Sequence, residues 1–262
     1  MEPFNRVCEC RYGPQVYNRH DRYVGRSLEL YGEFSPGEAD LFRQVIRPGD
    51  IVVEAGANVG AHTLHLARLV GSGGRILAFE PQRLCFQALC ATMALNSIPH
   101  AYCHHLALGD RRGAVLVPQL DPHRSHNFGG LSLARPGRPE ASEPVAVAPL
   151  DDFRPSRCRL IKVDVEGMEL EVLRGADATI RSCRPVLYVE NDRRENSPVL
   201  LSHIVELGYS IYLHNPPLFA PGNFRGNGEN VFGRVVSKNL LCLPEESRIA
   251  VQGLEPAAVR GG

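Results

Sequence analysis

Short apolar runs alternate with segments of helical spacing along most of this chain, and this alternation constrains the fold more than any other feature. Strands are expected over 50–55, 75–80 and 101–108, and helices over 62–70 and 81–96 lie between them. Strands and helices in this order form right-handed βαβ units. The sequence therefore predicts an α/β fold around a mostly parallel sheet.

The alternation is interrupted between residues 113 and 149 and then resumes. The interruption holds two strands of a hairpin, separated by a long segment rich in Pro, Gly and Arg that is typical of a binding loop or a disordered segment. The strands expected after 100 are 114–117, 144–148, 160–165, 186–190, 210–214 and 231–236, and the helices are 169–181 and 198–207. We expect three parts. An N-terminal segment (1–45) lies on the acceptor (substrate) side, a domain (46–244) carries the 113–149 insertion, and a tail (245–262) is partly disordered.

Composition narrows the class of protein. The chain of 262 residues is 44% apolar, enough to bury a core, and its 29 basic and 29 acidic residues lack the basic excess of a general nucleic-acid binder. No stretch approaches the ~20 apolar residues that cross a bilayer, and residues 1–13 lack the apolar core of a signal peptide. The cysteines form no C-x-x-C pair, so reduced thiols are expected. We expect a cytoplasmic protein without a nucleic-acid partner or a membrane span, and its oligomeric state stays open.

The segment E-A-G-A-N-V-G (54–60) stands where the first strand ends and a helix begins, which is where open α/β sheets bind ligands. Gly56 and Gly60 would let a ligand approach the backbone closely. Their G-x-x-x-G spacing differs from the dinucleotide pattern G-x-G-x-x-G. Glu54 would repel a pyrophosphate but would suit a ligand with an ammonium or sulfonium group, and S-adenosylmethionine carries both.

A second acid, Glu80, follows the next strand, 20 residues after Gly60. A carboxylate at this place can accept hydrogen bonds from both hydroxyls of a ribose, and such charge-assisted bonds are strong. An acid after a strand can also be solvated surface, but its spacing from the glycine turn favours nucleoside binding.

Four segments occur together in this chain: V-V-E-A-G-A-N-V-G-A-H-T (52–63), A-F-E-P (78–81), A-L-G-D (107–110) and I-K-V-D-V-E-G-M-E-L-E-V-L-R-G-A (161–176). In order and spacing the chain resembles the FkbM-type S-adenosylmethionine-dependent methyltransferases over roughly residues 23–244, although many members carry Asp in place of Glu54. The resemblance implies a Rossmann-like class I methyltransferase fold, with helices on both faces of the sheet. It also implies O-methylation of sugar or natural-product hydroxyls. The residues that it places at the cofactor are Glu54, Gly56, Asn58, Gly60 and Glu80, with Asp110 or its neighbours beside the adenine.

Carboxylates follow two later strands. Strand alternation places Lys162, Asp164 and Glu166 on one side, so that the two acids cluster at the carboxyl edge of the sheet. Close carboxylates raise one another's pKa, which could leave one of them poised as a general base. Alternatively, Asp164 holds a loop amide and Glu166 caps the next helix. Glu190, in Y-V-E-N-D (188–192), could bind an acceptor hydroxyl or belong to an ordinary turn.

Other sites are less well supported by the sequence. Asp164, Glu166 and Asp192 could hold a divalent cation, but no dedicated spacing requires one, so no metal is predicted. H-N-F-G-G (126–130) suits a hinged lid or an ordinary surface turn. His62 lacks metal-binding spacing and is expected at the surface or in a hydrogen bond.

Together these residues predict a methyltransferase that uses S-adenosylmethionine and methylates a hydroxyl of a sugar, glycoconjugate or natural product. The acceptor is thus a small molecule or a glycan, and Asp164, Glu166 or Glu190 would orient and deprotonate it under the loop 119–143. Acceptor specificity is expected in residues 12–42, in that loop and in 215–230. The alternatives are a non-catalytic S-adenosylmethionine-binding module and, less favoured because G-x-G-x-x-G is absent, an NAD-dependent oxidoreductase.

Overall fold

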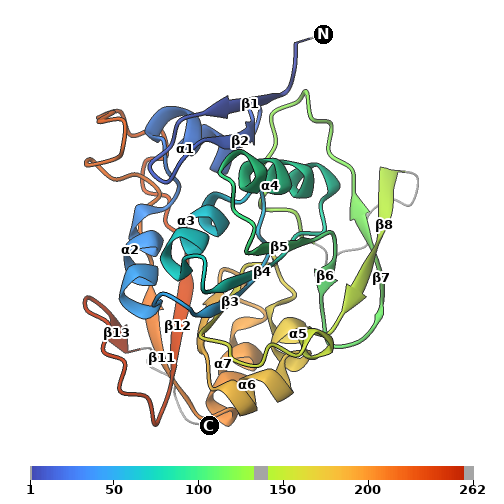
Figure 1. Cartoon of the computed structure of the whole chain (residues 1–262), viewed down its shortest axis with the longest axis vertical. Coiled ribbons are helices and arrows are strands. Elements are labelled where there is room, and N and C mark those ends of the chain that lie inside the picture. The colour runs from blue at the N-terminus through green and yellow to red at the C-terminus, as the bar shows by residue number, and fades with distance from the viewer. Residues whose placement is uncertain (1, 133–140, 257–262) are drawn as a thin grey trace.

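An eight-stranded sheet forms the centre of the molecule (Figure 1). The structure is a computed structural model that describes residues 2–132 and 141–256. In spatial order the strands are β13 (Glu255–Pro256), β11 (Tyr209–His214), β12 (Asn239–Pro244), β10 (Val186–Glu190), β9 (Leu160–Val163), β3 (Ile51–Ala55), β4 (Arg75–Phe79) and β5 (Ala101–His104). The strands from β10 to β5 pair in parallel, whereas β12 is antiparallel to both of its neighbours. The predicted α/β fold with a mostly parallel sheet is confirmed.

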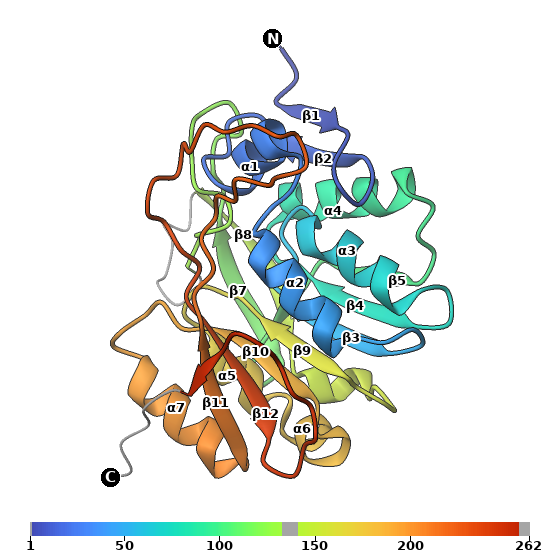
Figure 2. The ribbon, with the colours of Figure 1, turned by 90° about the vertical axis from the view of Figure 1, so that its left-hand side faces the viewer.

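Helices cover both faces of this sheet (Figure 2). On one face lie α2 (Pro36–Val45), α3 (Ala61–Val70) and α4 (Arg83–Leu95), and on the other lie α5 (Glu169–Arg174), α6 (Asp177–Cys183) and α7 (Ser197–Glu206). The central strands read as continuous apolar runs because both of their faces are buried. In β3, for example, Val52 packs in the core on the α2 side and Val53 in the core on the α5 side.

Two smaller β structures flank the central sheet. A hairpin of β1 (Asn5–Cys8) and β2 (Gln15–Asn18) precedes α1 (Val24–Tyr31). The predicted hairpin of the insertion is confirmed as β7 (Gly113–Pro118) and β8 (Ser142–Ala148). β8 also pairs with β6 (Ala107–Leu108), so the strand expected over 101–108 is divided between two sheets.

Three expectations about the later elements need correction or refinement. The helix expected over 169–181 is divided into α5 and α6, because the Gly175 oxygen accepts from the Asp151 amide and the Thr179 amide donates to the Asp151 carboxylate. Residues 231–236 form no strand. The strand that ends the 46–244 domain is instead β12, which is fully buried. In the tail, β13 pairs with β11, and residues 257–262 lie outside the described part of the chain.

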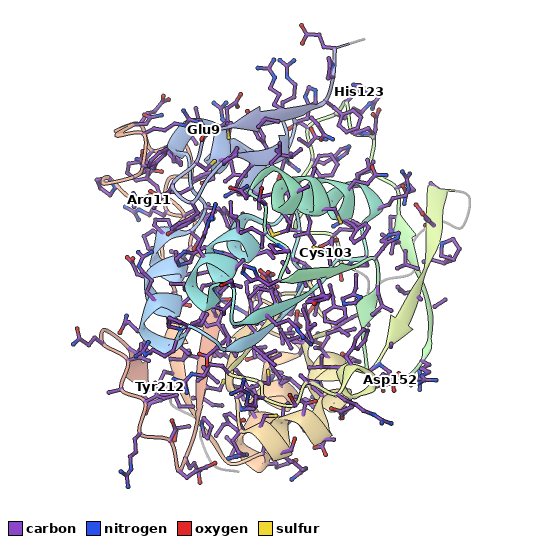
Figure 3. All side chains as sticks on the ribbon, in the orientation of Figure 1. Glu9, Arg11, Cys103, His123, Asp152 and Tyr212 are labelled. Atoms are coloured by element: carbon purple, nitrogen blue, oxygen red, sulfur yellow. The ribbon has the colours of Figure 1, made fainter. Side chains whose placement is uncertain are left out.

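The N-terminal segment is joined to the distant loop 215–230 through a buried acid. The guanidinium of Arg11, labelled in Figure 3, donates to Glu33 and to the Gly222 oxygen. Glu33 in turn accepts from the Phe224 amide at 2.8 Å. Two of the regions in which acceptor specificity is expected are therefore in direct contact. Over residues 2–132 and 141–256, no helix is both long and apolar enough to cross a bilayer.

Neighbouring residues on α7 provide a test of the packing. Ile204 is fully buried, whereas Val205 is 42% exposed. We expect Ile204→Ala to lower the free energy of unfolding by about 2–5 kcal/mol, because it removes buried methyl groups and leaves a cavity. The exposed control, Val205→Ala, should change it by less than about 0.5 kcal/mol. Urea unfolding of both variants measures the difference, and equal losses would contradict the assigned face of α7.

Candidate functional site

A row of polar side chains crosses the carboxyl edge of the parallel strands on the α2 side of the sheet. Strand alternation places them there, because every second residue of β3, β9 and β10 points to that face. The pairing registers agree, since Glu54 lies opposite Lys162 and Glu190 lies opposite Asn239. The members of the row are Glu80, Glu54, Lys162, Asp164, Glu190 and Asn239, and all of them line one cavity of about 350 Å³.

The glycine turn forms the floor of this cavity. Gly56 adopts φ +81°, and a Cβ at this position would lie 1.8 Å from the Asp164 oxygen, so only glycine fits. Gly60 does not line the cavity. It precedes α3 with φ +87°, and a Cβ there would lie 2.9 Å from Leu89 of α4. Of the two glycines, one shapes the cavity and the other lets two helices pack closely.

Glu80 is held by backbone amides at the end of β4. Its two oxygens accept from the Asn58 amide at 2.7 Å and the Gln82 amide at 2.8 Å. Burial raises the pKa of Glu80 to about 7, and the charges of Asp164 and Glu54 add to this effect. Each carboxylate oxygen can accept a second hydrogen bond. The oxygens of Glu80 therefore keep acceptor capacity for further hydrogen bonds, and its role at a ribose diol stays a prediction.

Glu54 is not the isolated anion that its place in the sequence suggests. It is 1% exposed, its Oε2 accepts from the Thr63 hydroxyl at 2.6 Å, and its Oε1 lies 3.7 Å from Lys162 Nζ. Burial raises the pKa of Glu54, and the Lys162 charge opposes that rise. Burial alone would lower the pKa of Lys162, but Asp164 and Glu54 outweigh it and raise that pKa. The negative charge at the end of β3 is therefore shared with a buried ammonium.

The structure separates Asp110 from the other cofactor residues named in the sequence analysis. Asp110 is exposed and lies 4.0 Å from Arg111. The cavity is lined at this place by Leu106, Ala107 and Leu108, residues of the same strand and turn. An apolar wall, and not the carboxylate, therefore faces the space beside Glu80.

Three carboxylates converge on the opposite side of the cavity. One oxygen from each of Asp164, Glu166 and Glu190 lies within 4.8 Å of the other two. Glu190 Oε2 is buried without a hydrogen-bond partner in the described part of the chain. Burial raises the pKa of Glu190 well above its usual range, and Asp164 and Glu166 raise it further. The clustering predicted for Asp164 and Glu166 is thus present, and Glu190 belongs to the same cluster.

Glu166 points into this cluster and not onto the next helix. Its backbone is left-handed (φ +57°), and its carboxylate forms an ion pair with Arg193. Burial raises the pKa of Glu166 to about 7, with contributions from Asp164 and Asp192. The acid that bonds an amide at the start of α5 is Glu169, which accepts from the Gly167 amide at 2.8 Å.

Sequence reasoning missed Glu38 and misplaced His62. Both side chains line the cavity and are almost fully buried, with His62 Nε2 3.4 Å from Glu38 Oε2. Burial alone would raise the pKa of Glu38, but His62 and Lys162 outweigh it and lower that pKa to about 2. The position of His62 directly after the glycine turn was a signal for its location. Glu38 gave none, because α2 and α3 meet only in the folded chain.

All three regions in which acceptor specificity is expected contribute to the lining, and residues 235–238, outside those regions, also line the cavity. Residues 12–42 supply Tyr23 and Phe34, the loop 119–143 supplies residues 127 and 129–131, and the loop 215–230 supplies Leu218. Gln82 Nε2 donates to the Phe128 oxygen at 2.6 Å, which holds the segment 126–130 at the cavity, and its role as a lid stays a prediction. Residues 133–140 of this loop lie outside the described part.

The raised pKa of Glu80 predicts a pH dependence of stability. Its pKa is about 7 in the fold against 4.5 ordinarily, so between these values the folded chain binds more protons than the unfolded chain. The free energy of unfolding should therefore fall as pH rises from 4.5 to 7, by on the order of 3 kcal/mol from this group. Glu80→Gln, which cannot ionise, should lose this contribution in urea unfolding across that pH range. Identical pH profiles for the two proteins would contradict the burial of an ionisable Glu80.

Comparison with known proteins places the chain in a family. Residues 54–211 match the family model described as "Methyltransferase FkbM domain". Among curated proteins, the chain is 30% identical over 146 residues to "Methyltransferase 1" of Beauveria bassiana, covering 48% of this chain and 58% of that protein. It is 29% identical over 156 residues to "Methyltransferase sdnD" of Sordaria araneosa, covering 48% and 60%. The aligned part thus spans a little over half the length of these relatives.

Solved structures show the same fold. Methyltransferase FkbM from Methylobacillus flagellatus KT is 19% identical, with a TM-score of 0.51 over 78% of this chain and 50% of that chain. Trm5b from Pyrococcus abyssi is 11% identical, also with a TM-score of 0.51, over 93% and 56%. The Rossmann-like class I methyltransferase fold is therefore confirmed. The family match covers more than half of the chain, so this protein belongs to the FkbM methyltransferase family, and its cofactor is S-adenosylmethionine.

Proposed function

We propose that this chain methylates a hydroxyl group of a small-molecule or glycan acceptor. The observation that carries the proposal is the convergence of Asp164, Glu166 and Glu190 within 4.8 Å, in the same cavity as the glycine turn and Glu80. A hydroxyl must lose its proton during methylation, and a carboxylate in such a cluster is suited to accept it.

The cofactor half of the cavity is assigned to the glycine turn and Glu80. S-adenosylmethionine, when bound, supplies a methyl group already activated by the positive charge on sulfur. Glu80 would accept hydrogen bonds from the ribose, and Gly56 leaves its backbone open to close approach. Glu54 and Lys162 keep the floor of the cavity polar and fixed. Positioning of this kind can contribute ~7–11 kcal/mol when the reacting groups are held near attack geometry.

The acceptor half is assigned to the three carboxylates. Glu166, with its pKa raised to about 7 by burial, can accept the hydroxyl proton near neutral pH. Burial raises the pKa of Glu190 well above its usual range, and in its protonated form Glu190 can donate a hydrogen bond to the acceptor oxygen. Asp164 is held by Lys162 Nζ at 3.0 Å and can orient the same hydroxyl. The phenyl ring of Phe34 and the Tyr23 side chain help to close the cavity around it.

Labelled cofactor tests this function directly. Cell extract incubated with the protein and isotope-labelled S-adenosylmethionine should yield products that carry the label as a methyl ether, detected by mass spectrometry. Glu80→Ala should reduce labelling because it removes the proposed ribose acceptor, whereas the exposed Glu195→Ala should not. Cofactor binding without any labelled product would favour the non-catalytic module, and label on nitrogen alone would refute O-methylation.

The base assignment predicts a selective loss of turnover. With an acceptor found in that experiment, Glu166→Gln should lower kcat about 100- to 10,000-fold and leave S-adenosylmethionine affinity unchanged in calorimetry. In the wild type, kcat should rise with pH through about 7, because Glu166 must be ionised to accept a proton. Glu171→Gln, on the first turn of α5, is the matched control. Full turnover by Glu166→Gln would show that another group is the base.

A further inference from the structure

A second cavity opens beside the first and has the opposite charge. It has a volume of about 440 Å³ and shares Tyr23 and Val235 with the catalytic cavity. Its polar lining comes mostly from the segment between β2 and α1, and its apolar floor from the loop before β12. We name it the arginine groove, and its lining is Arg19, His20, Asp21, Arg22, Tyr23, Arg26, Ser125, Val231, Phe232 and Val235.

The accessible charge of the arginine groove is positive. Its one carboxylate, Asp21, is 4% exposed and accepts from the Tyr23 and Gly25 amides, so it is not available to a ligand. Arg19 is paired with Glu2, and Arg26 with Glu29 at 3.2 Å. The guanidinium of Arg22 has no side-chain partner within residues 2–132 and 141–256 and is free to bind an anion.

The catalytic cavity next to the groove is acidic. Its lining includes six carboxylates besides Glu80, namely Glu38, Glu54, Asp164, Glu166, Glu190 and Asp192, against the cations Lys162 and Lys238. An anionic group would be repelled there and attracted into the arginine groove, whereas a neutral hydroxyl would enter the acidic cavity. Arginine forks match the oxygen geometry of phosphate and carboxylate groups.

The arginine groove also contacts the segment 126–130. The Arg22 amide donates to the His126 oxygen at 2.9 Å, and Asp21 forms a β-bridge with His126. Asn127, Gly129 and Gly130, which follow directly, line the catalytic cavity. A group bound at Arg22 would therefore lie beside the segment that covers the acceptor.

We propose that the arginine groove binds an anionic group of the acceptor, a phosphate or carboxylate, while the acceptor's hydroxyl lies among the carboxylates of the catalytic cavity. This inference rests on the proposed function for the hydroxyl and goes beyond it in naming the substrate class. Both cavities are of the size that small-molecule sites have, so the acceptor is an acidic or phosphorylated small molecule.

Calorimetry with inorganic pyrophosphate tests the groove without an acceptor. The protein is first saturated with S-adenosylhomocysteine, which occupies the cofactor half and keeps pyrophosphate out of the glycine turn. The double variant Arg22→Gln/Arg26→Gln should bind pyrophosphate at least about 10-fold more weakly than the wild type, because charged hydrogen bonds are lost. Binding should also weaken as salt is added.

Arg111→Gln/Arg112→Gln is the matched control, since it removes the same charge from exposed side chains. Arg112 pairs with Asp152, which Figure 3 shows far from the Glu9 and His123 end of the molecule. The control should keep wild-type affinity, and equal weakening in both double variants would overturn the proposal. If the first variant does not fold, Arg22→Lys replaces it and should weaken binding because the fork is lost.

Labelled methylation separates this inference from the proposed function. Given paired alcohols with and without a phosphate or carboxylate, the protein should label the anionic members preferentially. If only neutral members are labelled, the groove assignment fails and methyl transfer stands. If nothing is labelled although pyrophosphate binding depends on Arg22, methyl transfer fails and the anion site stands.

Discussion

The buried ammonium of Lys162 is the interaction on which the site depends. It lies between Glu54 of β3 and Asp164 just after β9, at 3.7 and 3.0 Å, and those two strands are direct neighbours in the sheet. A single buried carboxylate would be strongly disfavoured in its charged form, and the ammonium shared by Glu54 and Asp164 offsets that cost at the base of the cavity. The Asp164 amide donates to the Ala55 oxygen at 3.0 Å, and the Asp164 carbonyl oxygen approaches Gly56 so closely that no side chain fits there.

Charge is unevenly distributed around this centre. Toward the end of β10 the cations no longer match the acids, and burial raises the pKa of Glu190 well above its usual range. Toward the cofactor side, Glu80 accepts hydrogen bonds from two backbone amides and forms no ion pair within residues 2–132 and 141–256. The two ends of one cavity therefore differ in chemistry. The end at Glu80 is suited to accept hydrogen bonds from a diol, and the end at Glu190 is suited to exchange a proton.

The N-terminal segment completes the site that the parallel sheet begins. Glu38 approaches His62 from α2, Tyr23 separates the acidic cavity from the arginine groove, and Glu33 joins the segment to the loop before β12. These contacts bring together parts of the chain about 190 residues apart, as the bond from the Phe224 amide to Glu33 illustrates. Acceptor binding is thus expected to involve a wall built from both ends of the sequence.

The sequence by itself determined the sheet, the glycine turn and the acids at the strand ends, because period-two alternation and the strand–turn–helix junction are local properties. Glu80, Asp164 and Glu190 were found in this way. Only the tertiary structure decided that Lys162 lies beside Glu54 and that Glu38 faces His62. It also decided that Asp110 is not part of the cavity lining and that β12 pairs between β10 and β11. Each of these depends on which distant segments pack together, and burial and charge pairing at such contacts leave no periodic signal in the chain.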